Sequence, residues 1–486
     1  MLHLIKKQVI ELRLDKKLDG FRMQHLVSQH YWKDIIPELE KGFDDLSEAD
    51  EVIYMDKLEI DLGEVTAMNI EKDKWSSLFV RKVMEKVKER LVIKSGSSEM
   101  IKEGRALSIA RQWIFYMKNG YLPWNAIKVN SSWYDNVLEA LATDIATISE
   151  LRDLIKQEPF TPVRIANQHK EDFLVKVTGI LAAQNQHILP VAIEELAKIL
   201  SFIQPSTSSL SPSFKEIKKE IWIKVILAAA KKESSLSSDK ITEIILSDYL
   251  KEYPFLEELR EALFDKLNYT QPALTKLFKE NINPSTPSEI RKKNQEEREK
   301  NKALSSSKQK PISETKQVYE EGIFTQNGGI VLLHPFIHSF FNRLKLVKNG
   351  SFTDKSSQQK GIYLLHFLAT GKTEAKEYEL VIPKVLCAFP IENPVDGGVE
   401  LSEAEIEEAG DVLTAAILQW EILQNTSIQG FREGFVQRNG KLLTKKDQWY
   451  LQIESNSIDI LLDHLPWNLS IIKLPWMKEL LRVEWR

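Results

Sequence analysis

Two stretches with few apolar residues limit what this chain can fold into more than any other feature. Residues 204–213 read QPSTSSLSPS, and residues 283–316 are rich in proline, serine and charge. Within the second stretch, residues 289–310 hold eight Lys or Arg and four Asp or Glu. Such compositions bury too little apolar surface to offset the entropy of ordering, which predicts solvated linkers. A basic strip for an acidic partner is the alternative use of residues 289–310.

These linkers divide the 486 residues into separate folded parts, each with enough apolar material for a core. We expect an α+β protein that is predominantly α-helical. The predicted parts are an N-terminal α/β unit with a long helix (1–95), a helical domain (96–203), a linker (204–213), a helical segment (214–282), a charged Ser-Pro linker (283–316) and a C-terminal globular domain (317–486).

The N-terminal unit is predicted from two periodicities. Residues 10–14 and 57–63 alternate apolar and polar side chains, which is typical of half-buried strands. A helical pattern fills residues 21–46 between them, so a β-α-β unit is the simplest interpretation. A long helix should follow, because apolar residues then recur every fourth position, at Trp75, Phe79, Val83, Val87 and Leu91.

The C-terminal domain is predicted to be compact and mostly helical, with a few short strands. Ser402 and Glu405 form a capping box, which should begin a helix reaching about residue 423. Residues 449–453 and 481–485 alternate like strands. Upstream, residues 107–119 read as a helix that ends at Gly120.

The totals exclude several classes of protein. A net charge of −4 argues against binding nucleic acid through bulk charge. One cysteine, Cys387, excludes an intrachain disulfide and a cysteine-based zinc site, and its apolar neighbours predict a buried thiol. No signal peptide and no uninterrupted apolar run of membrane length is found. We expect a cytoplasmic protein, or one that leaves the cell only within an assembly.

Two motifs could carry chemistry, and both are better explained structurally. Residues 369–373, ATGKT, resemble the end of a phosphate-binding loop, but His366 stands where that loop requires glycine. Gly371 is therefore expected to end a helix. His334 and His338 lie one helical turn apart and, with His366, could hold a metal ion. No carboxylate completes a known zinc motif, so we expect no metal, no cofactor and no catalytic residue.

Tryptophan is the conspicuous excess, with 11 in the chain. Three follow Leu-Pro, at Trp124, Trp467 and Trp476. Proline fixes its own φ and keeps the preceding leucine extended, which gives the tryptophan a defined direction and a large area to bury. These units are predicted to be rigid corners that pin chain reversals onto a core, and a surface for a partner protein is the alternative.

Several sequence stretches resemble one known family, the contractile injection system tape measure proteins of phage-tail-like particles. The resemblance covers residues 1–125 and 320–486 and is weak between them. It rests on these stretches: QVIEL (8–12), DKLEIDLG (56–63), GYLPW (120–124), GGIVLLHPF (328–336), LLHFLATG (364–371), KVLC (384–387), WEILQNTS (420–427), GFREGFVQRNG (430–440), DILLD (459–463), both late Leu-Pro-Trp units and VEW (483–485).

The resemblance implies a non-enzymatic structural protein that sets or supports the length of the inner tube during assembly. It implies contacts with tube, baseplate or cap proteins, with self-association left open, and a place inside the assembled particle after assembly in the cytoplasm. The residues in matching stretches that we single out as structural or interface candidates are Trp124, His334, Phe336, Arg432, Trp467, Trp476 and Trp485.

A protein that measures tube length by its own length must be extended, and the sequence of this chain does not favour one extended structure. At about 1.5 Å per residue, 486 helical residues would reach on the order of 730 Å. The sequence holds 18 prolines and two linkers, however, and only residues 126–316 could stretch between the folded ends. Two hypotheses remain: folded ends that anchor a spanning middle, or a compact assembly factor or tube plug. An enzyme or a cargo effector carried by the particle is the third, of a different class.

Overall fold

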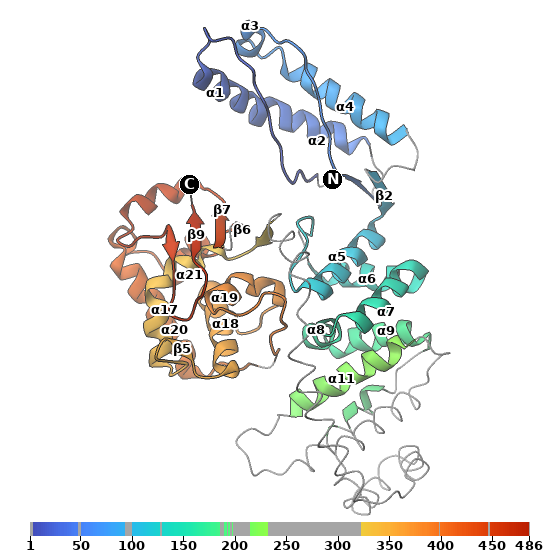
Figure 1. The fold of residues 1–486 in the computed structure, drawn as a ribbon, viewed down its shortest axis with the longest axis vertical. Coiled ribbons are helices and arrows are strands. Elements are labelled where there is room, and N and C mark those ends of the chain that lie inside the picture. The colour runs from blue at the N-terminus through green and yellow to red at the C-terminus, as the bar shows by residue number, and fades with distance from the viewer. Residues whose placement is uncertain are drawn as a thin grey trace, which may run out of the picture. The chain divides into compact units, whose positions relative to one another are not determined.

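The computed structural model describes residues 3–46, 50–92, 100–126, 129–184, 214–231, 322–397, 399–445 and 448–485, with a few positions between 189 and 197 (Figure 1). These residues form two compact units. One comprises Met1–Arg111 with Trp124–Ala140, and the other Gln112–Pro123 with Leu141–Arg486. Both predicted linkers, and residues 232–282 of the predicted helical segment, lie outside the described residues, so the domain boundaries stay a prediction.

Helices dominate the first unit. Asp19 caps α1 (Gly20–His30) by accepting hydrogen bonds from two backbone amides, and a π-helical turn (Tyr31–Ile35) continues into α2 (Ile36–Asp44). The short α3 (Ala67–Glu71) precedes α4 (Ser76–Val92). Both predicted helical segments are confirmed. The core between these helices is built from Met23, Val27, Ile35, Leu39, Ile70, Trp75, Val83 and Val87.

The predicted strands at residues 10–14 and 57–63 are wrong. Both segments are extended, but neither is a strand. The only sheet in the described part of this unit pairs β1 (Glu51–Met55) with β2 (Met100–Gly104), antiparallel. Alternation of apolar and polar residues favours an extended backbone, whereas a strand also requires a neighbour that pairs with its backbone.

A block of helices follows β2, and the division between the two units falls within α5 and α6. The end of α5 (Arg105–Asn119) is closed by Gly120 at φ +84°, as predicted. Next come α6 (Ser131–Thr143), α7 (Ile145–Gln157), α8 (Phe160–Gln168) and α9 (Glu171–Ala182). Then α11 (Phe214–Ala230) packs against α7, α8 and α9. We call the part of this block in the second unit the helical block.

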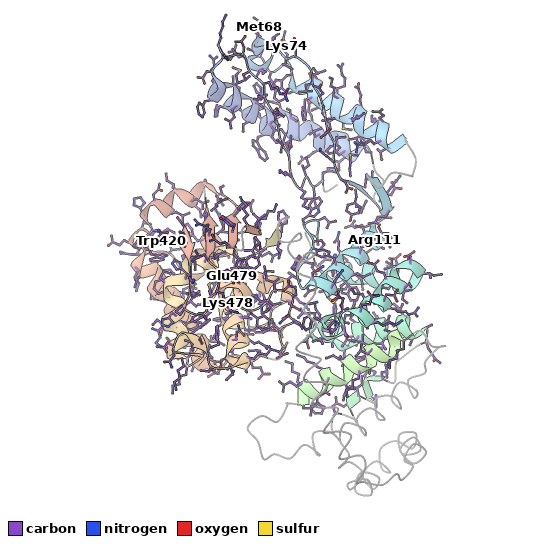
Figure 2. The ribbon with its side chains drawn as sticks, viewed as in Figure 1. Met68, Lys74, Arg111, Trp420, Lys478 and Glu479 are labelled. Carbon is purple, nitrogen blue, oxygen red and sulfur yellow. The ribbon has the colours of Figure 1, made fainter. Side chains whose placement is uncertain are left out.

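The C-terminal part of the second unit surrounds one large core. Its helical elements are η3 (Gly328–Leu333), α17 (His334–Arg343), α18 (Lys355–Thr370), η4 (Glu377–Leu380), α19 (Val381–Leu386), α20 (Glu403–Gln419), η5 (Glu421–Leu423), α21 (Ile428–Phe431), η6 (Arg432–Val436) and η7 (Ser457–His464). The Ser402–Glu405 capping box and the Gly371 helix end (φ +74°) are confirmed. Cys387 is fully buried, as is Trp420, which is labelled in Figure 2.

A five-stranded sheet completes this part, in the order β3-β6-β7-β9-β8. Its strands are β3 (Ile323–Thr325), β6 (Gly440–Lys445), β7 (Gln448–Ile453), β8 (Ile471–Ile472) and β9 (Leu481–Glu484). Only β7 and β9 are parallel, and these are the two strands that the sequence predicted. A two-residue hairpin, β4 (Val347–Lys348) with β5 (Ser351–Phe352), lies apart from this sheet. The α+β, predominantly helical fold class is confirmed.

None of the helices in the described ranges has both the length and the apolar content needed to cross a membrane.

Gly329 gives a stability prediction, because a Cβ there would lie 1.8 Å from the Phe435 carbonyl oxygen. Backbone cannot move aside cheaply, so Gly329→Ala should destabilise the protein by about 3 kcal/mol, the upper end for overpacking. Gly410→Ala in α20 is the matched control, because its Cβ would meet open space. It should be neutral or stabilising by up to about 1 kcal/mol. Equal urea midpoints for the two variants would contradict this account of Gly329.

Candidate functional site

The two late Leu-Pro-Trp units both reach α17. The Trp467 indole nitrogen donates to the Leu332 carbonyl at 3.1 Å, and its ring meets Phe336 edge to face, with centroids 5.4 Å apart. The Trp476 nitrogen donates to the Leu386 carbonyl at 2.7 Å. Its ring stacks on Phe341, 5.6 Å away, and also contacts His338 and Phe352. Each tryptophan therefore combines apolar packing with a satisfied N–H.

Arg432 and His334 lie at helix ends. The Arg432 guanidinium donates to the Leu368 and Phe367 carbonyls at 3.0 and 3.1 Å, so a cation supplies donors to the last turn of α18. His334 begins α17, and its Nδ1 lies 3.0 Å from the Val331 carbonyl oxygen. Burial lowers the pKa of His334, so the ring stays neutral at pH 7.

The remaining two candidates are the first and last tryptophans of the set. Trp485 is 8% exposed, and the Arg438 guanidinium lies 6.0 Å from its ring centroid. Trp124 is half-buried in the first unit, and the neighbouring Asn125 donates to the Tyr54 hydroxyl at 3.0 Å. The structure thus clusters Phe336 with Trp467 and leaves the other candidates at separate places.

The two chemical motifs have structural roles. Thr370 ends α18, and its hydroxyl donates to the His366 carbonyl at 2.9 Å, so ATGKT is a helix end. His366 is buried, with Nε2 3.2 Å from the Glu374 carbonyl oxygen. Across the described ranges, no three His, Cys, Asp or Glu side chains converge as metal ligands would.

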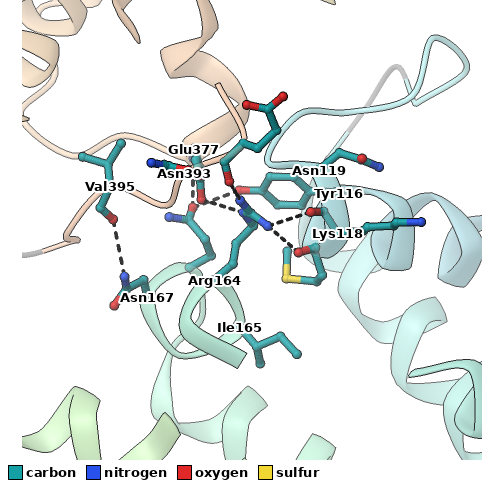
Figure 3. Close-up of polar contacts among 12 residues, drawn as sticks. Tyr116, Lys118, Asn119, Arg164, Ile165, Asn167, Glu377, Asn393 and Val395 are labelled. Carbon is teal, nitrogen blue, oxygen red and sulfur yellow. Dashed lines mark hydrogen bonds and ion pairs between the residues drawn. The ribbon is translucent and has the colours of Figure 1, made fainter. Parts of the chain in front are cut away.

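A buried ion network is the most unusual site in the second unit (Figure 3). Arg164 on α8 is fully buried, and its Nε donates to Glu377 Oε2 at 2.9 Å. Its Nη1 donates to the carbonyls of Met117 and Lys118, the latter at 3.1 Å, and its Nη2 donates to the Glu392 carbonyl. One guanidinium thereby joins α5, α8 and the C-terminal part.

Lys384 completes the network from the opposite side of the carboxylate. Its Nζ donates to Glu377 Oε1 at 2.7 Å and to the carbonyls of Ile391 and Asn393 at 2.9 and 2.8 Å. Its side chain is 1% exposed, and that of Glu377 is 0% exposed. Burial lowers the pKa of Lys384 to about 8, against the opposing effect of the Glu377 charge.

The charges of this network balance only with the help of helix carbonyls. Two cations, Arg164 and Lys384, share the single carboxylate of Glu377. Met117 and Lys118 lie in the last turn of α5, where unpaired carbonyls give the helix a partial negative charge. The carbonyls at the end of α5 thus supply part of the negative charge that balances the second cation.

Neighbouring side chains join the same two parts. Gln168 Oε1 accepts from the Tyr116 hydroxyl and from the Glu377 amide, both at 2.9 Å. Lys376 Nζ donates to the Gln168 carbonyl at 2.7 Å. A Cβ at Gly120 would lie 2.9 Å from Glu377 Oε1 and 3.1 Å from Arg164 Nη2. Gly120 therefore ends α5 and also makes room for the ion pair.

Sequence reasoning missed this network, although one signal pointed to it. Lys384 stands in VIPKVLCAF, where apolar residues surround a single charge, and Arg164 stands between Val163 and Ile165 as the single charge of FTPVRIANQ. A charge inside an apolar run is expected to be paired, because an isolated buried charge is very unfavourable. The partner of either residue could not be read from the chain, because Arg164 and Glu377 are 213 positions apart.

Truncating Arg164 should be strongly destabilising. Arg164→Ala leaves Glu377 with one cation and removes the donors to three carbonyls, which we expect to cost about 3–5 kcal/mol, as for other broken buried pairs. Arg343→Ala is the control, because Arg343 is 53% exposed in its pair with Glu408 and should cost no more than about 1 kcal/mol. Denaturant melts with matching midpoints for both variants would contradict a structural role for Arg164.

His169, next to Gln168, predicts a dependence of stability on pH. The Trp113 indole can only donate, so His169 Nε2 accepts its hydrogen bond (3.0 Å) and Nδ1–H donates to the Ile165 carbonyl (2.9 Å). Burial lowers the pKa of His169 to about 3 from 6.5. Below about pH 6.5, His169 therefore binds a proton in the unfolded chain but stays neutral in the folded chain. The free energy of unfolding falls as the pH decreases through this range. Between pH 7 and 5, unfolding midpoints should fall more for the wild type than for His169→Gln, and parallel curves would contradict this.

Comparison with known proteins identifies the family of this chain. No curated protein and no solved structure shows significant similarity to the chain. One family model does match, described as contractile injection system tape measure protein, and it covers residues 2–485. That match includes both units and every residue of the ion network. The chain therefore belongs to the contractile injection system tape measure protein family, whose members are structural components of the particle.

Proposed function

We propose that this chain is a non-enzymatic assembly component that acts as a folded body and influences the length of the inner tube through protein contacts. The observation that carries the proposal is the Arg164–Glu377–Lys384 network. It joins the helical block to the C-terminal part through fully buried charges. Separating the two parts would expose three charged groups or leave them without partners, which disfavours any partly opened state.

A ruler that spans the tube would instead require these residues to separate. For the ends to move apart, residues 126–316 would have to leave the C-terminal part, and Arg164 lies within that range. The helical block is also packed internally, since Lys218 on α11 donates to Glu194 at 2.8 Å and pairs with Glu171 on α9. The geometry thus favours the compact assembly factor or tube plug over an end-to-end ruler.

Partners and location follow from family membership as parts of this proposal. Tube, baseplate or cap proteins are the proposed contacts, with assembly in the cytoplasm and a final place inside the particle. The half-buried Trp467 and Trp476 favour contacts through a rigid surface, because their N–H groups already donate to internal carbonyls. An enzyme or a cargo effector finds no comparable support, since the polar clusters found here hold elements together.

A disulfide across the two parts tests the proposal directly. An ideal Cβ on Gly397 would lie 3.6 Å from the Cβ of Asn167, which is within the range for disulfides. Asn167→Cys with Gly397→Cys should therefore lock the helical block to the C-terminal part. The native Cys387 is fully buried and should not compete. Particles would be produced in a host with an oxidising cytoplasm, and their tube lengths measured by electron microscopy.

A folded body predicts that locked protein supports normal numbers of particles with wild-type tube length. The single variants Asn167→Cys and Gly397→Cys are the matched controls for the substitutions themselves. If oxidation abolishes particles or shifts their length, and reducing conditions restore them, the two parts must separate during assembly and the proposal is wrong.

A further inference from the structure

The first unit contains two extended segments whose backbones have no pairing partner. Residues 7–14 and 56–64 are both described, and neither is joined by backbone hydrogen bonds to another segment of the described chain. Two backbone carbonyls of the second segment accept hydrogen bonds from side chains of α4: Lys82 Nζ donates to Asp61 O at 2.7 Å, and Arg90 Nη1 donates to Lys57 O at 2.6 Å. Figure 1 shows the chain before α1 and after β1 as extended traces beside the helices.

The acidic segment, residues 56–64, has the form of a strand on a helical layer. Leu58, Ile60 and Leu62 are half-buried against the core of the unit, and the residues between them are exposed. The Lys57 and Asp61 carbonyls point to the same backbone edge, where Arg90 and Lys82 donate to them, and the other edge is open. Such an open edge accepts a further strand through main-chain hydrogen bonds.

The basic segment, residues 7–14, has apolar side chains that the unit leaves wholly or partly exposed. Val9 is 74% exposed, and Ile10 and Leu12 are 38% and 37% exposed. Only Leu14 packs on the core. A run of exposed, alternating apolar residues on an unpaired extended backbone is a surface for strand pairing.

Charge indicates which strand each segment would accept. The basic segment holds Lys7 and Arg13 against Glu11, and Lys6 precedes it. The acidic segment holds four carboxylates, at Asp56, Glu59, Asp61 and Glu64, against Lys57. Opposite charges on paired strands are stabilising and like charges are destabilising. Two acidic segments or two basic segments are therefore mismatched, whereas one of each is matched.

We propose that a second copy of this chain docks here, with the basic segment of each copy pairing with the acidic segment of the other. Both segments belong to the same unit, so two copies supply two matched pairs and the exchange closes as a symmetric dimer. The pairing supplies backbone partners to both segments and covers Val9, Ile10 and Leu12. This inference is independent of the proposed role in tube length.

Charge reversal on the full-length chain tests the docking. One variant carries Glu59→Lys and Asp61→Lys, and the other carries Lys7→Glu and Arg13→Glu. All four side chains are exposed, so both variants should melt like the wild type. Self-association is measured by sedimentation over a range of protein and salt concentrations.

The wild type should dimerise, and each variant alone should associate at least about tenfold more weakly, because its two edges then carry charge of the same sign. An equimolar mixture of the two variants should dimerise again, because each reversed edge meets an opposite one. A wild type that stays monomeric throughout would overturn the proposal, as would variants that self-associate as well as the wild type. A mixture that fails to associate would assign the weakening to another cause and would also overturn it.

Discussion

The position of the Arg164 guanidinium in a dry interior is the constraint on which the second unit depends. A buried charge is tolerated only with a counter-charge and a full set of hydrogen bonds. Arg164 obtains these from three places: Glu377, the last turn of α5 and the Glu392 carbonyl. Removing any one of them leaves charge or donors unsatisfied, so the helical block and the C-terminal part are stable together.

That dependence explains several local choices in the sequence. Gly120 must lack a side chain because the carboxylate of Glu377 and the guanidinium of Arg164 occupy the space beside it. Gln168 links the Tyr116 hydroxyl to the Glu377 amide, and Lys384 occupies the far side of the carboxylate. In the C-terminal part, the rings of Trp467 and Trp476 pack on α17, and their N–H groups donate to the carbonyls of Leu332 and Leu386. A folded body held in this way suits a protein that works through shape and contacts.

Local patterns predicted local structure well. The capping box at Ser402, the helix ends at Gly120 and Gly371, the α4 helix and the β7 and β9 strands could all be predicted, because each depends on a few neighbouring residues. Residues 10–14 and 57–63 are extended without being strands, because alternation defines a face but does not supply a partner strand. The ion network could not be predicted, since its partners come from distant parts of the chain.

The exchange rate of the Glu377 amide proton tests the central claim most directly, because that amide donates across the two parts to Gln168. Native-state hydrogen exchange would be measured at single-residue resolution, with buried amides of α18 as the internal reference. If the helical block and the C-terminal part form one cooperative body, the Glu377 amide should open with a free energy close to that of global unfolding. Fast exchange at Glu377 while the α18 amides stay protected would show that the two parts separate readily, and would contradict the account.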